Sequence, residues 1–97
     1  MYARITHYSV DPSRFEEVRR FTEEQLIPAF RRLPGFRHYF GTGDRATGRG
    51  YAITLWDTAD QAQALRSALG ELVAQIQALG LQLDAPEVQE VVAHAEA

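Results

Sequence analysis

Apolar residues recur at helical spacing in a first stretch of the chain, between Asp11 and Gly35. At 100° per residue, seven positions of this stretch fall within an arc of about 120°. These positions are Phe15, Val18, Thr22, Leu26, Ala29, Phe30 and Leu33. Asp11 and Pro12 are typical of a helix start, because an Asp side chain accepts unpaired backbone N–H groups and proline suits the first helical turn. The pattern predicts an amphipathic helix, which Pro28 should kink because proline lacks a backbone donor.

A second helical pattern follows the segment Thr58–Gln61, whose Thr-x-x-Gln spacing is that of a capping box. Its apolar positions again share an arc of about 120°. They are Ala62, Leu65, Leu69, Leu72, Val73, Ile76 and Leu79. The phase of the pattern does not slip at Gly70. We therefore expect one long or bent helix, which Gly80 ends.

Four further segments have the β-branched and aromatic residues typical of strands. They are Tyr2–Val10, Phe36–Phe40, Tyr51–Trp56 and Pro86–His94, and the glycine-rich segment Gly41–Gly50 joins the second to the third. The order β-α-β-β-α-β predicts an α+β domain of ferredoxin-like topology, with two helices on one face of a four-stranded antiparallel sheet of order 4-1-3-2. We expect residues 1–97 to form this single domain, because 97 residues have room for one core.

The predicted strands carry apolar residues on both faces of the sheet. Phe36 and Phe40 alternate with Tyr39, and the third strand alternates in the same way. A sheet with one solvent-exposed face would show polar residues at every second position. The face without helices would be a large apolar patch on a monomer, so we expect a homodimer formed by sheet-to-sheet packing.

Composition and charge narrow the function classes. The formal net charge is −3 and basic residues form no stripe, which argues against nucleic acid and anionic membranes as partners. No apolar run approaches the roughly 20 residues that cross a bilayer, and the first residues lack the features of a signal peptide, so the expected location is the cytoplasm. The chain has no Cys, Lys or Asn. This removes thiolate metal ligands, cysteine nucleophiles and lysine Schiff bases.

Three passages carry a resemblance to a known family. They are Leu26–Phe36 with its Ile-Pro-Ala-Phe and Leu-Pro-Gly-Phe sequences, Ile53–Thr58 (ITLWDT), and the closing Pro86–Val88. Together they make the chain similar to the antibiotic biosynthesis monooxygenase-like (ABM) proteins of the dimeric α/β barrel superfamily. The resemblance implies a homodimer. The family includes cofactor-free monooxygenases and haem-degrading enzymes. The haem-degrading branch uses an Asn, a Trp and a His, of which this chain matches only Trp56, so haem degradation is not expected.

Trp56 is the only Trp and ends the third predicted strand. It is either a packing residue or, as the resemblance implies, a flat wall for an aromatic ligand. Phe21 and Ile27 lie off the apolar stripe of the first helix and are candidate walls of the same pocket. Within this hypothesis we predict that Trp56 lines the pocket together with His38.

The candidate polar residues lie on the predicted strands. His38 first and His7 second are candidate catalytic acid–base groups, since histidine titrates near neutral pH; the alternative is a surface or interface histidine. Arg4 and Tyr39 are candidate ligand-binding residues. So is Arg37, but either arginine could instead pair with a carboxylate across the dimer. The three histidines occupy three different strands, so no metal site is expected.

Two functions remain open at this point. The first is a cofactor-free monooxygenase of a hydroxylated aromatic, in which oxygen reacts with the electron-rich substrate itself. The second is a non-catalytic dimer that binds a hydrophobic small molecule or serves as an interaction module. A ligand-sized cavity lined by at least two of His7, His38, Arg4 and Tyr39 would favour the enzyme.

Overall fold

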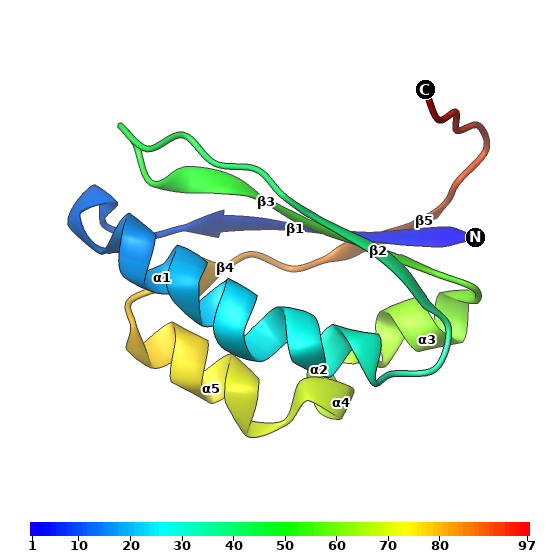
Figure 1. Cartoon of the computed structure of the whole chain (residues 1–97), viewed down its shortest axis with the longest axis horizontal. Helices are drawn as coiled ribbons and strands as arrows, with labels where there is room; N and C mark the ends of the chain where they lie inside the picture. The colour runs from blue at the N-terminus through cyan, green and yellow to red at the C-terminus, as the bar shows by residue number, and fades with distance from the viewer.

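A computed structural model describes residues 1–97, the whole chain. One antiparallel sheet forms the first layer and all helices form the second, on one face of the sheet (Figure 1). The strands are β1 (Tyr2–Ser9), β2 (Phe36–Gly41), β3 (Arg49–Trp56), β4 (Gln82–Leu83) and β5 (Glu87–Glu90). Their order is β2-β3-β1-β4, and β5 also pairs with β1. This confirms the predicted ferredoxin-like arrangement of the sheet and helices.

The last predicted strand, Pro86–His94, differs from the structure in two ways. The edge of β1 is covered by two short strands, β4 opposite Tyr8 and β5 opposite Tyr2–Ile5. Pro86 lies in the break between them, where a missing backbone donor interrupts no ladder. Residues 91–97 have no regular structure and leave the sheet on the side away from the helices (Figure 1).

The first helical stretch is continuous but changes its winding. It consists of η1 (Pro12–Arg14, 3-10), α1 (Phe15–Phe21), η2 (Thr22–Leu26, a π-helix) and α2 (Ile27–Arg31). Asp11 accepts a hydrogen bond from the Ser13 N–H, as its helix-start role predicts. The effect at Pro28 is a change of winding: the π-helical turn directly precedes the segment Ile27-Pro28, where the regular ladder of donors is interrupted.

The prediction of one long or bent second helix is wrong. The structure has α3 (Ala59–Gln63), α4 (Leu65–Leu69) and α5 (Glu71–Ala78). The predicted capping box of Thr58 and Gln61 begins α3. Gly70 separates α4 from α5 at φ 56° and ψ −125°, a conformation that glycine adopts because it has no Cβ. None of the helices has the length and apolar character that crossing a membrane requires.

The core lies between the two layers. Its nine buried apolar residues are Val10, Val18, Leu26, Phe30, Trp56, Ala62, Leu65, Ile76 and Leu81. Six of them belong to the two predicted apolar stripes: Val18, Leu26, Phe30, Ala62, Leu65 and Ile76. Phe15 and Leu69 of the same stripes are half-buried, and both line a cavity between the layers.

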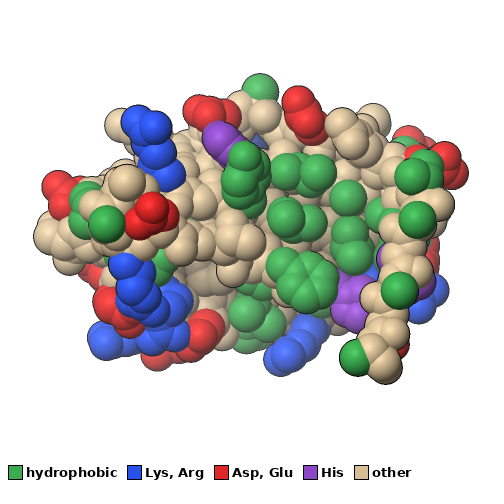
Figure 2. Space-filling model, turned by 90° about the horizontal axis from the view of Figure 1, so that it is seen from above, with side chains coloured by type: hydrophobic (Ala, Val, Ile, Leu, Met, Phe, Trp, Pro, Cys, Tyr) green, Lys and Arg blue, Asp and Glu red, His purple; other side chains and the backbone are tan.

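The opposite face of the sheet carries no helix. Ile53 of β3 lies opposite Ile5 of β1 and Phe40 of β2. His38 of β2 lies opposite Leu55 of β3. Figure 2 looks onto this face and shows apolar side chains gathered over its middle. A bulge between Phe36 and His38 shifts the alternation of β2, so that Phe36 packs on Phe30 of the helical layer while Phe40 stands on the helix-free face. The sequence pattern had placed Phe36 and Phe40 on the same face.

Candidate functional site

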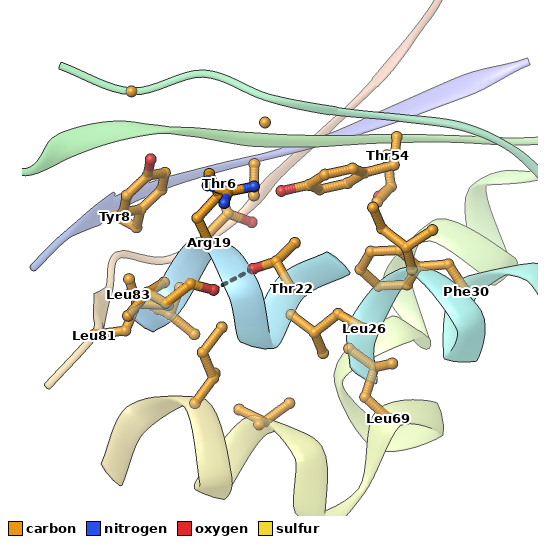
Figure 3. A pocket seen from close by; sticks show the side chains of 18 of the residues that line it. Thr6, Tyr8, Arg19, Thr22, Leu26, Phe30, Thr54, Leu69, Leu81 and Leu83 are labelled. Atoms are coloured by element: carbon orange, nitrogen blue, oxygen red, sulfur yellow. Dashed lines mark hydrogen bonds between the residues drawn. The ribbon is translucent and has the colours of Figure 1, made fainter. Parts of the chain in front are cut away.

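A cavity of about 470 Å³ lies between the sheet and the helices (Figure 3). The sheet supplies Thr6, Tyr8 and Thr54 on one side, and the helices supply Leu26, Phe30 and Leu69 on the other. About half of the lining residues are hydrophobic, and the others include four arginines, two carboxylates and four threonines. A space of this size and character is typical of sites for small organic molecules.

Three polar side chains form a row across the sheet on the cavity side. Tyr39 of β2 is directly opposite Thr54 of β3, and Thr54 is directly opposite Arg4 of β1. All three line the cavity. Adjacent strands are about 4.8 Å apart, so the backbones of Tyr39 and Arg4 are separated by about 10 Å. The row therefore has the length of a two- or three-ring aromatic molecule.

Tyr39 presents a neutral phenol to the cavity. Burial, and secondarily the nearby Tyr8, raise the pKa of Tyr39 to about 12. The Tyr8 hydroxyl donates to the carbonyl oxygen of Thr42 at 2.6 Å, whereas no side-chain hydrogen bond within the protein uses the Tyr39 hydroxyl. Gly41 makes room for it, because a Cβ there would lie 2.5 Å from the hydroxyl oxygen. Tyr39 can therefore donate a hydrogen bond to a ligand at neutral pH, but it cannot serve as a base.

Arg4 supplies a positive charge to the same cavity. One of its terminal nitrogens, Nη1, donates to the carbonyl oxygens of Ala62 at 3.0 Å and Gln63 at 3.4 Å, at the end of α3. Burial, followed by the charge of Arg66, lowers the pKa of Arg4. The other predicted arginine, Arg37, lies outside the cavity and is paired with Asp57 of its own chain.

The two histidines predicted as catalytic groups lie on the helix-free face, across the sheet from the cavity. His7 is exposed, with its ring centroid 4.0 Å from that of Tyr51 and its Nδ1 3.9 Å from Asp84. His38 is exposed and stacks on Phe40. Neither lines the cavity, and no three His, Asp or Glu side chains are grouped closely enough to hold a metal ion.

Trp56 does not line the cavity. It is 1% exposed, its indole N–H donates to the Thr54 hydroxyl at 2.8 Å, and its ring meets Phe36 edge-on. The predicted pairing of Trp56 with His38 around one ligand is not formed within the protomer, because the two side chains lie on opposite faces of the sheet. Of the two candidate wall residues, Ile27 lines the cavity and Phe21 lines a separate shallow hollow beside α5.

Sequence analysis missed several lining residues, among them Thr6, Tyr8, Thr54 and Arg66. A signal for three of them is present in the sequence. Thr6 and Tyr8 follow Arg4 at every second position of β1, and Thr54 is two residues before Trp56, so they share a face with residues that were singled out. No comparable pattern marks Arg66 on the helical layer.

Comparison with known proteins identifies the fold. No family model and no curated protein matches the sequence. Among solved structures, a proposed antibiotic biosynthesis monooxygenase from Deinococcus radiodurans matches with a TM-score of 0.77 at 14% identity, over 100% of this chain and 98% of that chain. This chain has the ABM-like fold. The resemblance inferred from the sequence is thereby confirmed for the fold.

Two further solved structures share this fold. A dimeric ferredoxin-like protein from an uncultured marine organism matches with a TM-score of 0.70 at 8% identity, over 99% of this chain and 98% of that chain. SnoaB, a cofactor-independent oxygenase from Streptomyces nogalater, matches with a TM-score of 0.64 at 21% identity, over 96% and 94%. At these identities the ABM-like fold is shared, and the activity of this chain is a separate question.

Proposed function

We propose that this protein is a homodimeric, cofactor-independent monooxygenase of a hydroxylated aromatic molecule. The observation that carries the proposal is the 470 Å³ cavity with Arg4 and Tyr39 both on its lining. It meets the condition that the sequence set for an enzyme, although the two polar groups are not the histidines. The similarity to SnoaB supports the same reaction class.

For this reaction the protein needs mainly to bind the substrate and to stabilise its negative charge. An aromatic substrate with a hydroxyl group becomes electron-rich when it loses a proton to solvent, and the guanidinium of Arg4 favours that anion. Tyr39 donates a hydrogen bond to an oxygen at the other end of the polar row. When a CH₂ group is oxidised to a carbonyl, it supplies the four electrons that O₂ accepts; one oxygen atom enters the product and the other leaves as water with the two hydrogens.

The homodimer is the second part of the proposal. The helix-free face exposes 55% of Phe40 and 43% of Tyr51. Ile53 lies opposite Phe40 on one side and Ile5 on the other, and apolar side chains gather over this face (Figure 2). Val92, in the segment that leaves the sheet on this side, is 87% exposed. A second copy seated on this face would remove these apolar side chains from water.

Sedimentation velocity tests the dimer. We expect a dimer for the wild type at micromolar concentration, and a folded monomer for Ile53→Glu, because two buried carboxylates would face each other at the interface. Gln77→Glu adds the same charge on the exposed surface of α5 and serves as the matched control. A monomeric wild type, or a dimer that survives Ile53→Glu, would contradict this assembly.

Oxygen consumption tests the activity. With 1,8-dihydroxyanthrone as substrate, we expect consumption of one O₂ per substrate above the rate without protein, unaffected by a metal chelator. Tyr39→Phe removes the donor and should lower the rate at least tenfold. Arg31→Gln is the control, because Arg31 is exposed on α2 and away from the cavity.

One observation favours the non-catalytic alternative, a dimer that binds a hydrophobic molecule. No histidine lines the cavity, and of its two carboxylates Glu23 is paired with Arg19 at 2.7 Å while Asp84 lies 3.9 Å from His7. Saturable binding of the anthrone without oxygen consumption would establish this alternative.

A further inference from the structure

The charges around the cavity are unbalanced at one place. Four arginines line it, and two of them are paired: Arg19 with Glu16 and Glu23, and Arg45 with Glu16. The other two, Arg4 and Arg66, take part in none of the ion pairs of the protein. The remaining lining carboxylate, Asp84, lies next to His7.

The two unpaired arginines lie close together. Arg4 reaches from β1 to the end of α3, where it binds the carbonyl oxygens of Ala62 and Gln63, and Arg66 follows three residues later in the first turn of α4. The charge of Arg66 is near enough to lower the pKa of Arg4. Two like charges therefore lie near the α3–α4 junction, and neither forms an ion pair with a carboxylate of the protein.

The protein's own groups satisfy Arg4 only in part. Both of its hydrogen bonds leave from Nη1, so Nε and Nη2 keep their donors for another partner. No side-chain hydrogen bond of Arg66 occurs within the protein, and its side chain is exposed where it borders the cavity. An anionic group between the two guanidiniums would accept charge-assisted hydrogen bonds and remove their mutual repulsion.

We propose that Arg4 and Arg66 form an anion subsite at the α3–α4 end of the cavity, and that the natural ligand is an aromatic molecule with a carboxylate or another oxyanion at one end. This inference rests on the proposed ligand-binding role of the cavity and adds the class of ligand. In the row of polar side chains, the anionic end binds at Arg4, and Tyr39, about 10 Å away along the row, binds a neutral oxygen at the other end.

A pair of fluorescent probes that differ by one charge tests the subsite. 8-Anilino-1-naphthalenesulfonate and N-phenyl-1-naphthylamine share the same ring system, and only the first carries a sulfonate. We expect the wild type to bind the sulfonate about tenfold more tightly than the neutral probe, a preference that weakens as salt is added. In Arg66→Gln the preference should fall to about twofold while the affinity for the neutral probe stays within twofold of the wild type.

Three controls make the result specific. Arg66→Lys keeps the charge and should retain most of the preference. Arg31→Gln removes an exposed helical arginine outside the cavity and should retain all of it. Val73→Phe fills part of the cavity and should weaken both probes together, which places them inside it.

The outcomes separate this inference from the proposed function. Binding of both probes with equal affinity, or a preference for the sulfonate that Arg66→Gln leaves intact, overturns the anion subsite but leaves the ligand cavity. Sulfonate binding that Val73→Phe does not weaken also overturns it, because the anion is then held elsewhere. If neither probe binds, both the subsite and the ligand-binding role of the cavity are wrong.

Discussion

The hydrogen bond between Trp56 and Thr54 offers a sharp test of how the sheet wall of the cavity is held. Trp56 is 1% and Thr54 3% exposed, and the indole N–H reaches the Thr54 hydroxyl at 2.8 Å. Thr54→Val keeps the shape of the side chain but removes the acceptor. The buried N–H then has no partner, which should lower the free energy of unfolding by about 1–3 kcal/mol.

A double-mutant cycle separates this bond from packing. Trp56→Phe alone loses the bond and leaves space behind the ring, and we expect a loss of about 2–3 kcal/mol. In the Thr54→Val background the same change should cost about 1 kcal/mol less, because no unpaired N–H remains. Urea unfolding followed by far-UV circular dichroism, at one protomer concentration, gives all four stabilities.

Thr54→Ser is the matched control for the cycle, since it keeps the acceptor. It should lie closer to the wild type than Thr54→Val in stability and keep the Trp56 emission of the wild type. A Thr54→Val protein as stable as the wild type, or strictly additive losses in the cycle, would show that the bond does not support this wall.

Three further predictions concern other parts of the molecule. Ultraviolet titration should show one tyrosine with a pKa of about 12 that is absent from Tyr39→Phe, and a midpoint near 10 would contradict the burial of the phenol. Because folding raises this pKa from 10.0, the contribution of Tyr39 to stability is present below pH 10 and is lost as the pH rises to 12. Gly70→Ala should lower stability by about 1–2 kcal/mol in thermal unfolding although a Cβ there meets no atom within 4 Å, since φ is 56°; an unchanged melting temperature would contradict the strain argument. Leu69→Ala should lower the free energy of unfolding in urea by about 1–2 kcal/mol, because Leu69 is half-buried at the cavity and a fully buried leucine would lose about 2–5 kcal/mol. A loss above about 3 kcal/mol would place Leu69 in the packed core.

The sequence predicts the layers of this fold better than the continuity of its helices. Strand composition and order were sufficient for the sheet, because the β-branched and aromatic segments are separated by clear turn signals. Gly70 shows the limit for helices. The apolar residues Leu69 and Val73 keep the same phase on both sides of it, and a periodic pattern reports which residues face the core and not whether the backbone between them stays helical.

The candidate site could be predicted only in part for a related reason. The candidate residues Arg4 and Tyr39 lie on the cavity lining, whereas the candidate histidines His7 and His38 lie on the other face of the sheet, a choice of face that the sequence leaves open. On β1 both alternating sets are partly apolar, with Ile5 beside His7 in one and Tyr8 beside Thr6 in the other, so the sequence does not say which set faces the helices. The bulge after Phe36 has no glycine or other mark in the sequence, and it decides that Tyr39 faces the cavity and His38 does not.

That bulge also bears on how the protein avoids aggregation. β2 is an outer strand of the sheet, and a regular outer strand presents a row of free backbone groups to which the strand of another molecule can add. The irregularity between Phe36 and His38 interrupts that row, and the charged, exposed Arg37 stands at the same point. Strand addition at this edge is therefore disfavoured, whereas the proposed dimer through the helix-free face is a closed contact that forms no open-ended fibre.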